Sequence, residues 1–252
     1  MKQTITLFLF LLSSILSLHA VELDSLKTAA DKAYAKEDFD KAAKLYTRIS
    51  KTGESASVCY NLGNCYYRMD DIAKAILWYE RASLLSPGDE DIRFNLDLAR
   101  SKTIDRIIPK HEFFFVLWYR QMTNWMNADA WARFSITAFI LCLCFFAAYI
   151  YGQQMWMRKT GFTLSIILLL LTVIGNVCGW SQANKMKNRD GAIVMTSSAV
   201  VKSTPSLSGS DLFVLHEGTY VTIRDNSLKD WAEVTLADGK QGWIEKRQIE
   251  GI

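Results

Sequence analysis

The chain has 252 residues, of which 50% are hydrophobic, and its formal net charge is +3. This hydrophobic content exceeds what one soluble core requires, so the composition indicates membrane segments. Basic and acidic residues balance over residues 21–110, and acidic residues are in slight excess over 191–252, so the positive excess lies around residues 120–189. A nucleic-acid-binding protein would concentrate positive charge on a soluble domain. We therefore exclude nucleic acid as a partner.

Residues 1–20 have the pattern of a secretory signal peptide. Lys2 gives a positive start, Ile5–Leu18 is an apolar stretch, and Leu18-His19-Ala20 is an acceptable cleavage site. An uncleaved membrane anchor is the alternative interpretation. In both cases we expect the residues that follow to be exported.

Residues 21–110 are predicted to form an α-helical tetratricopeptide repeat domain. Within residues 56–87, seven residues fall at the spacing of this helix–turn–helix unit: Leu62, Gly63, Tyr66, Ala75, Tyr79, Ala82 and Pro87. Gly63 and Ala75 are small enough to let two antiparallel helices approach closely. An earlier copy of the unit is indicated by Phe39, Ala42 and Tyr46, each 33 residues before its counterpart. Asp91–Arg100 is expected to be a capping helix.

The concave face of the first helices is the candidate peptide-binding site. It would hold Tyr60, Asn61, Asn64, Tyr67 and Arg68 from one unit, and Phe94, Asn95 and Leu98 from the next. In peptide-binding tetratricopeptide proteins, which this segment resembles, asparagines in such places hold the ligand backbone. The lysines that complete a carboxylate clamp in that family are not evident here. The alternative is that these asparagines cap or bridge helices.

Residues 111–131 are rich in aromatic side chains and precede an apolar segment. Phe114, Leu117, Trp118 and Trp125 would share one helical face, which predicts a helix over 112–126 lying along a membrane. A core helix of the repeat domain is the alternative. Residues 132–151 and 162–180 are each long enough to span a bilayer core of about 30 Å as a helix. Together they predict a two-helix transmembrane hairpin, with a loop over residues 152–161.

The charges around this hairpin give conflicting predictions of its orientation. The loop carries Arg158 and Lys159, which favours a cytoplasmic location, but the outer flanks carry more basic residues than the loop. We give precedence to the signal peptide, because it commits the first domain to export before the later spans are made. Asn176, deep in the second span, is expected to bond the neighbouring helix.

Residues 191–252 are predicted to form an all-β domain. Five short runs rich in β-branched and aromatic residues are Val200–Lys202, Leu212–Leu215, Tyr220–Arg224, Trp231–Leu236 and Gln241–Ile244. Asp238-Gly239 is a strong hairpin signal. Five strands in about sixty residues favour an SH3-like barrel.

The sequence Leu215–Thr219, with Trp231, Asp238-Gly239 and Gly242-Trp243-Ile244, resembles the bacterial SH3 (SH3b) family. Some members of that family bind peptidoglycan peptides. The resemblance makes Trp231 and Trp243 candidate residues, although paired tryptophans are largely structural in the family. The domain lacks cysteine, so it has no Cys–His–acid set of the kind found in the peptidases that such domains accompany.

The five cysteines do not form a disulfide framework, because three lie in the apolar spans and Cys59 and Cys65 would lie on different helix faces. The sequence shows no metal-ligand spacing, no phosphate-binding loop and no nucleophile–base pair. We expect neither an enzyme nor a cofactor.

The order of the segments is similar throughout to the BatE-type proteins of the aerotolerance (Bat) operons. The resemblance covers nearly the full chain, including an Asp105-Arg106-Ile107 segment. It implies partners among envelope proteins, namely the membrane-anchored von Willebrand A-domain (VWA) proteins and other repeat proteins of the operon, alongside a MoxR-type ATPase. It implies an inner-membrane scaffold with periplasmic binding domains, linked to envelope or oxidative stress tolerance. A peptidoglycan sensor that uses its SH3b domain is the alternative.

Overall fold

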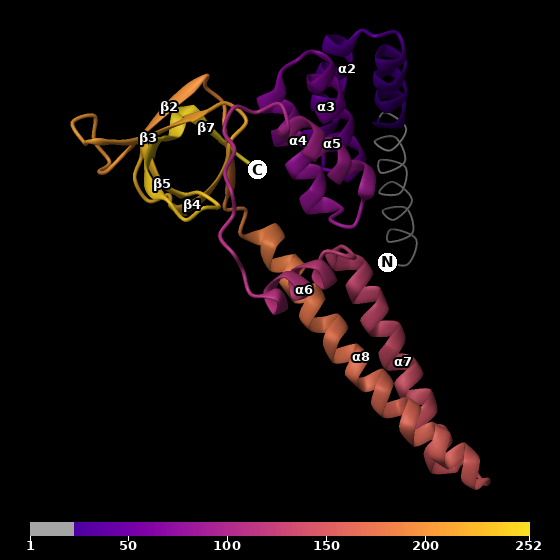
Figure 1. Cartoon of the computed structure of the whole chain (residues 1–252). Coiled ribbons are helices and arrows are strands. Elements are labelled where there is room, and N and C mark those ends of the chain that lie inside the picture. Colours follow the sequence, from indigo (N-terminus) through magenta and orange to yellow (C-terminus); the bar gives the residue numbers. More distant parts are fainter. Residues whose placement is uncertain (1–22) are drawn as a thin grey trace, which may run out of the picture. The chain divides into compact units, whose positions relative to one another are not determined.

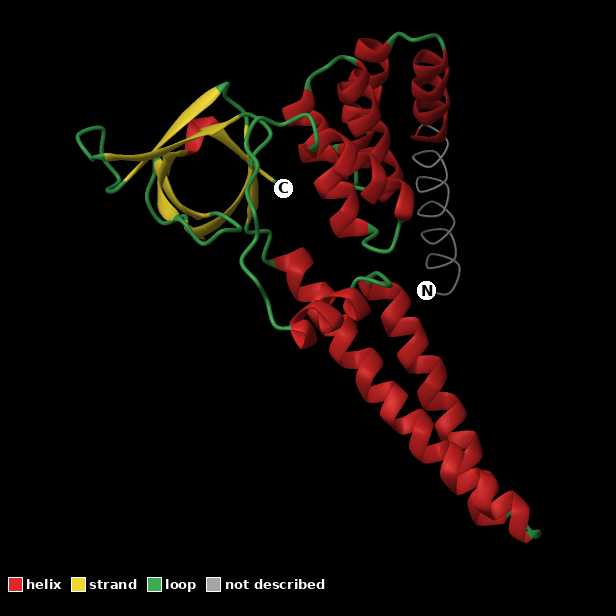
Figure 2. Ribbon diagram, in the orientation of Figure 1, coloured by secondary structure: helices red, strands yellow, loops and turns green. Residues whose placement is uncertain are grey.

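The computed structural model describes residues 23–252, so the predicted signal peptide lies outside the described residues. The described chain forms two compact units. One contains residues 23–83, Glu90–Ile108 and Asp190–Ile252, and the other contains Leu84–Asp89 and Pro109–Arg189. The helical repeats, the two long apolar helices and a C-terminal antiparallel sheet that the sequence predicts are all present (Figures 1 and 2).

The repeats consist of short antiparallel helices. Residues 23–35 are helical, and the helices that follow are α2 (Phe39–Ser50), α3 (Ala56–Arg68), α4 (Ile72–Leu85) and α5 (Glu90–Arg100). The turns before α2 and α4 are equivalent. Glu37 and Asp70, 33 residues apart, both have a φ of 61°, and in each turn the next aspartate accepts a hydrogen bond from the backbone N–H three residues on. This match in the turns reflects the sequence repeat.

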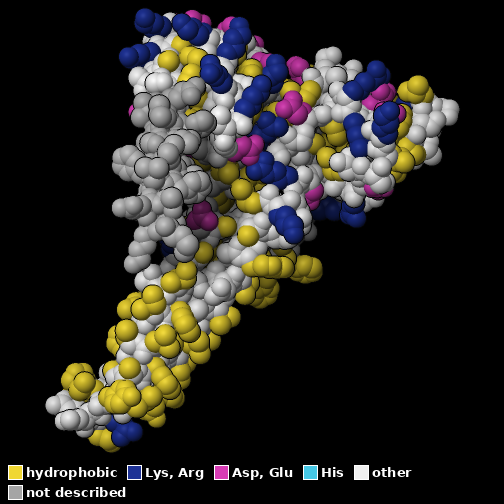
Figure 3. All heavy atoms as spheres, turned by 180° about the vertical axis from the view of Figure 1, so that it is seen from behind, with side chains coloured by type: hydrophobic (Ala, Val, Ile, Leu, Met, Phe, Trp, Pro, Cys, Tyr) yellow, Lys and Arg dark blue, Asp and Glu magenta, His cyan; other side chains and the backbone are white. Residues whose placement is uncertain are grey.

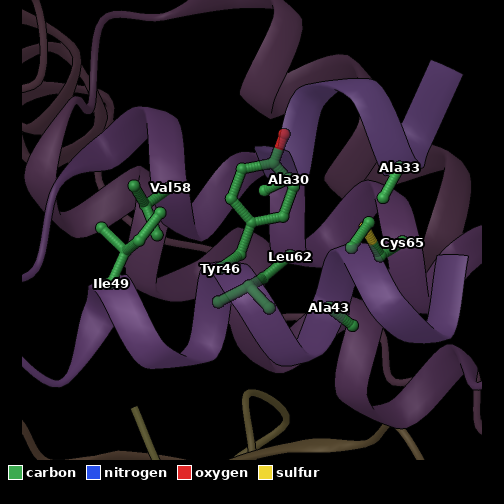
Figure 4. Packing of buried hydrophobic residues seen from close by; sticks show 9 residues of the cluster. Ala30, Ala33, Ala43, Tyr46, Ile49, Val58, Leu62 and Cys65 are labelled. Carbon is green, nitrogen blue, oxygen red and sulfur yellow. The ribbon is translucent and has the colours of Figure 1, made fainter. Parts of the chain in front are cut away.

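The core of the first repeat surrounds Tyr46, which is 1% exposed and lies among Ala30, Leu62 and other small or aliphatic side chains (Figure 4). In the next repeat, a Cβ on Gly63 would lie 2.5 Å from the Tyr79 ring. Ala75 is fully buried. The close helix contact predicted at Gly63 is therefore confirmed.

The C-terminal sheet has seven antiparallel strands in the order β3-β2-β6-β5-β4-β1-β7. Their bounds are β1 Gly191–Val194, β2 Ser198–Lys202, β3 Asp211–His216, β4 Tyr220–Asp225, β5 Trp231–Thr235, β6 Gln241–Glu245 and β7 Ile249–Gly251. The sequence prediction missed β1 and β7, because strands of four and three residues at the ends of the domain give almost no periodic signal. β3 and β7 are the two edges, so hydrogen bonding does not close the sheet into the predicted SH3-like barrel.

The second unit contains α6 (Phe114–Thr123) and the hairpin of α7 (Ala128–Tyr151) and α8 (Met155–Lys187). By length and composition, α7 and α8 can each cross a membrane, and hydrophobic side chains cover the hairpin (Figure 3). The connecting turn is only Gly152–Gln154. The predicted loop over 152–161 is therefore wrong for residues 155–161, which contain no proline and carry good helix formers that extend α8 past its apolar part.

Small side chains line the contact between α7 and α8. The buried residues at this contact include Ser135, Ala138, Cys142, Gly161, Ser165, Gly175 and Cys178. Asn176 Nδ2 donates to Ser135 Oγ at 2.5 Å, and Ser135 Oγ donates to the Thr172 carbonyl at 3.2 Å. The predicted bond from Asn176 to the neighbouring helix is therefore confirmed. Close packing and interhelical hydrogen bonds are the forces that associate helices in lipid.

Helix α6 contacts the end of the hairpin that lies away from the Gly152–Gln154 turn. The Thr123 carbonyl accepts hydrogen bonds from Gln182 Nε2 at 2.6 Å and from Trp131 Nε1 at 3.1 Å. Thr123 is the only buried residue of α6, whereas the aromatic side chains are exposed. Within its own compact unit, α6 is therefore a surface helix. The exposed aromatic face is that of a helix suited to a membrane surface.

Candidate protein-binding site on the repeats

The residues predicted to form the binding face lie on two neighbouring helices. Tyr60, Asn61, Asn64, Tyr67 and Arg68 are on α3, and Phe94 and Asn95 are on α5. Asn95 Nδ2 donates to Tyr60 Oη at 2.6 Å, which links the two helices directly. The two groups of candidate residues therefore belong to one surface.

The asparagines of this surface also bridge helices. Asn64 Oδ1 accepts a hydrogen bond from Tyr79 Oη at 2.7 Å, and Asn61 Nδ2 donates to Tyr46 Oη at 3.2 Å. Tyr46 Oη in turn donates to Asp31. Asp31–Tyr46 and Asn64–Tyr79 are the same bond in successive repeats, with partners 15 residues apart in each. These contacts match the bridging alternative, and they use part of the hydrogen-bonding capacity of each amide.

The tyrosines remain hydrogen-bond donors under ordinary conditions. Burial raises the pKa of Tyr79, and burial followed by the Asp31 carboxylate raises the pKa of Tyr46. A protonated phenol can donate to a carboxylate or to an amide oxygen. The phenols can therefore donate these hydrogen bonds at neutral pH.

Exposed apolar side chains offer the surface available to a ligand. Phe94 is 69% exposed and Leu98 is 40% exposed, and they lie one helical turn apart on α5. Arg68 is exposed at the end of α3, where its guanidinium carbon lies 4.8 Å from the centroid of the Phe39 ring. Lys102 Nζ lies 4.3 Å from the centroid of the Tyr67 ring, which belongs to α3. Exposed aromatic and aliphatic side chains on a repeat surface can bind an extended or helical peptide through side chains.

The segment after α5 holds a contact whose role sequence reasoning missed. The Asp105 carboxylate accepts hydrogen bonds from the His216 backbone N–H at 2.7 Å and from Thr219 Oγ1 at 2.7 Å, and it lies 2.8 Å from His216 Nδ1. Burial would raise the pKa of Asp105, but these hydrogen bonds outweigh it and hold the pKa below its usual value. The segment was noticed in the sequence only through the family resemblance.

Asp105 fixes the connecting segment to the sheet. Ile107, two residues on, packs against the core of the β-domain. Residues Asp105–Ile108 line a cavity of about 350 Å³ together with side chains of β3 and the β5–β6 turn. The linker is thereby an integral part of the β-domain surface.

Trp231 and Trp243 lie on adjacent strands of the sheet. Trp231 pairs with Glu245 and Trp243 pairs with Glu233, so all four side chains share one face. The alternate residues, such as Ala232 and Ile244, are fully buried on the other face, whereas the tryptophans are half-buried. The pair is therefore accessible from outside the core.

The described residues hold no group of three His, Cys, Asp or Glu side chains that could bind a metal ion. The tetratricopeptide repeat family model matches residues 56–89, which agrees with α3 and α4 and the turn that follows them. No curated protein matches the chain. The repeat match identifies this segment as a protein-interaction module, a class without catalytic activity of its own.

Proposed function

We propose that this protein is an inner-membrane scaffold that presents a repeat domain and a β-domain in the periplasm and binds envelope proteins there. The hairpin of α7 and α8 supplies the membrane anchor. The exposed Phe94–Leu98 strip beside α3 is the observation that supports the proposal, because neighbouring exposed apolar side chains on a protein-interaction module are available to a partner. The resemblance to BatE-type proteins supports a VWA-domain protein or a repeat protein of the Bat operon as the partner.

Binding of the purified full chain to such a VWA-domain protein tests this proposal. Phe94→Ala together with Leu98→Ala should weaken the complex by about ten- to a hundredfold, because hot-spot aromatic contacts typically contribute about 2 kcal/mol or more. Arg93→Ala is the matched control, since its exposed side chain lies about 100° further round the same helix. If the double variant and the parent protein bind with equal affinity, the Phe94–Leu98 strip is not part of the binding site.

A second candidate function is peptidoglycan binding by a β-domain of SH3b type. The outward-facing tryptophan pair favours it, because aromatic rings and adjacent carboxylates suit a polar peptide with an apolar stem. Trp243→Ala should then reduce binding of the full chain to purified cell-wall sacculi and leave the VWA-protein affinity unchanged. Unchanged binding to sacculi would leave the tryptophans with a structural role only.

A further inference from the structure

A polar junction joins the end of α6 to the last turns of α8. The Gln182 side chain, which is buried, donates from Nε2 to the Thr123 carbonyl at 2.6 Å and to Asn124 Oδ1 at 3.1 Å. Lys185 Nζ donates to the same Asn124 Oδ1 at 2.9 Å. Figure 1 shows α6 lying against this part of α8. Two donors from α8 therefore hold the side-chain amide of Asn124 in one orientation.

The junction presents hydrogen-bond donors that lack acceptors. Because Asn124 Oδ1 accepts both bonds, the Nδ2 group faces away from them, and it has no partner among the described residues. Lys185 uses one of its three donor hydrogens, and it forms no ion pair with a described carboxylate. Arg120 lies one turn before Asn124, but Glu112 is paired with it at 2.7 Å. Lys185 is therefore the cation of the junction that has only a neutral partner.

The junction lies at the depth of lipid headgroups when the apolar part of α8 crosses a bilayer. That apolar part ends at Trp180, and Lys185 lies about 7.5 Å further along the helix axis, at 1.5 Å per residue. The headgroup region adds about 5–8 Å to each side of the hydrocarbon core. Trp180 and Trp125 are each 71% exposed, and exposed tryptophans are typical of the boundary between hydrocarbon and headgroups.

A phosphate group is the anion available at this depth, and its oxygens can accept from an ammonium and an amide together. We propose that Lys185 and Asn124 bind the phosphate of an anionic phospholipid, with the exposed rings of Trp125 and Trp180 at the level of its glycerol. A zwitterionic lipid has the same phosphate but adds a cation, which Lys185 and Arg120 repel, so the site prefers a lipid of negative net charge. This inference rests on the membrane anchor of the proposed function, and neither the partner nor the orientation enters it.

The experiment titrates the full chain in detergent with short-chain phosphatidylglycerol and with phosphatidylcholine of the same chain length. Native mass spectrometry gives the two affinities, and the parent protein should prefer phosphatidylglycerol by at least about fivefold. Lys185→Gln removes the charge but keeps a donor for Asn124 Oδ1, so the junction should stay intact. This variant should bind phosphatidylglycerol about five- to tenfold more weakly and phosphatidylcholine as the parent does.

The matched control is Lys159→Gln, which makes the same change at an exposed lysine at the opposite end of the hairpin and should leave both affinities unchanged. Equal losses in the two variants would show attraction by overall charge and overturn the proposal. Equal affinity of the parent protein for the two lipids would also overturn it. Displacement of phosphatidylglycerol by an equal concentration of glycerol phosphate would overturn it in favour of a site for soluble phosphate esters.

The membrane anchor is checked separately with the full chain in phosphatidylcholine liposomes. Extraction of the protein by alkaline carbonate would contradict the anchor, and with it both the proposed function and this inference. Retention in the liposomes together with no preference for phosphatidylglycerol would contradict this inference alone.

Discussion

Asp105 shows how one partly buried carboxylate joins two segments that are far apart in the sequence. Its three contacts reach His216 and Thr219, 111 and 114 residues further along the chain. No local periodicity or motif can signal a pairing at this separation, so sequence analysis could find the residue but not its role. The His216 backbone N–H and the Thr219 hydroxyl both donate their hydrogen bonds to this carboxylate.

The Asp105 contact should persist to mildly acidic pH. The folded pKa lies below the ordinary value of 3.8, so the ionised carboxylate stabilises the fold above that value, and the stabilisation is lost as the pH falls through the folded pKa. We expect protection of the His216 amide against hydrogen exchange, corrected for intrinsic rate, to be unchanged from about pH 7 to about pH 5. Asp105→Ala should remove this protection at every pH. Retained protection in that variant would show that the carboxylate does not hold the segment.

Asn64 is the residue for which the structure most changes the interpretation. Asn64→Ala removes the acceptor for the Tyr79 hydroxyl and should destabilise the repeats by about 1 kcal/mol, or a few degrees in Tm. Asn64→Asp should retain most of the stability, since Asp31 accepts the equivalent bond in the preceding repeat. Thermal melts of the full chain followed by helical circular dichroism provide the measurement. Equal losses in the two variants would contradict the bridging role.

At the scale of elements, the close packing of α7 and α8 depends on small residues. A Cβ on Gly161 would lie 2.8 Å from the Phe145 carbonyl oxygen and 2.9 Å from the Tyr149 amide nitrogen, both backbone atoms of α7. Gly161→Leu should therefore separate the ends of the helices, at a cost of about 1–3 kcal/mol. The expected readout is faster proteolysis at the Gly152–Gln154 turn in detergent. Thr163→Leu, at an exposed position two residues away, should leave the rate unchanged.

The elements that the sequence predicted well are those with strong local patterns. The repeat helices follow the positions of Gly63, Ala75 and the tyrosines, and the two long apolar helices follow long apolar runs. The predicted turn between α7 and α8 is too long, because the low hydropathy at Arg158 and Lys159 marks the edge of an apolar span and not the end of a helix. β1 and β7 depend on pairing with each other and with β4, which no short run of residues can reveal.

For the whole molecule, the order of soluble, membrane and soluble parts follows from composition, whereas orientation does not. A hairpin that crosses the membrane twice would place both flanking domains on one side, and we propose the exported side because of the predicted signal peptide and the loop charges. Protease added to spheroplasts should therefore degrade the repeat domain and the β-domain and leave the α7–α8 hairpin protected. Survival of both domains until the membrane is broken would indicate that the basic outer flanks determine orientation.

For the candidate binding site, the sequence predicted which residues share a surface but not which of them are exposed. The repeat pattern placed Tyr60, Asn95 and Phe94 on one surface, and the Asn95–Tyr60 bond brings the two helices together there. It could not distinguish the exposed Phe94 from the hydrogen-bonded asparagines, because exposure and bonding arise only when neighbouring helices pack. The central claim, a partner held on the Phe94 strip, therefore depends on a property visible only in three dimensions.

Photo-crosslinking in native membranes tests that claim most directly. Benzoylphenylalanine in place of Phe94 should give, on irradiation, an adduct with a VWA-domain or repeat protein of the same operon. The same group in place of Arg93, about 100° further round α5, should give less than about a tenth as much adduct. Equal adducts at the two positions, or no protein adduct at position 94, would contradict the account.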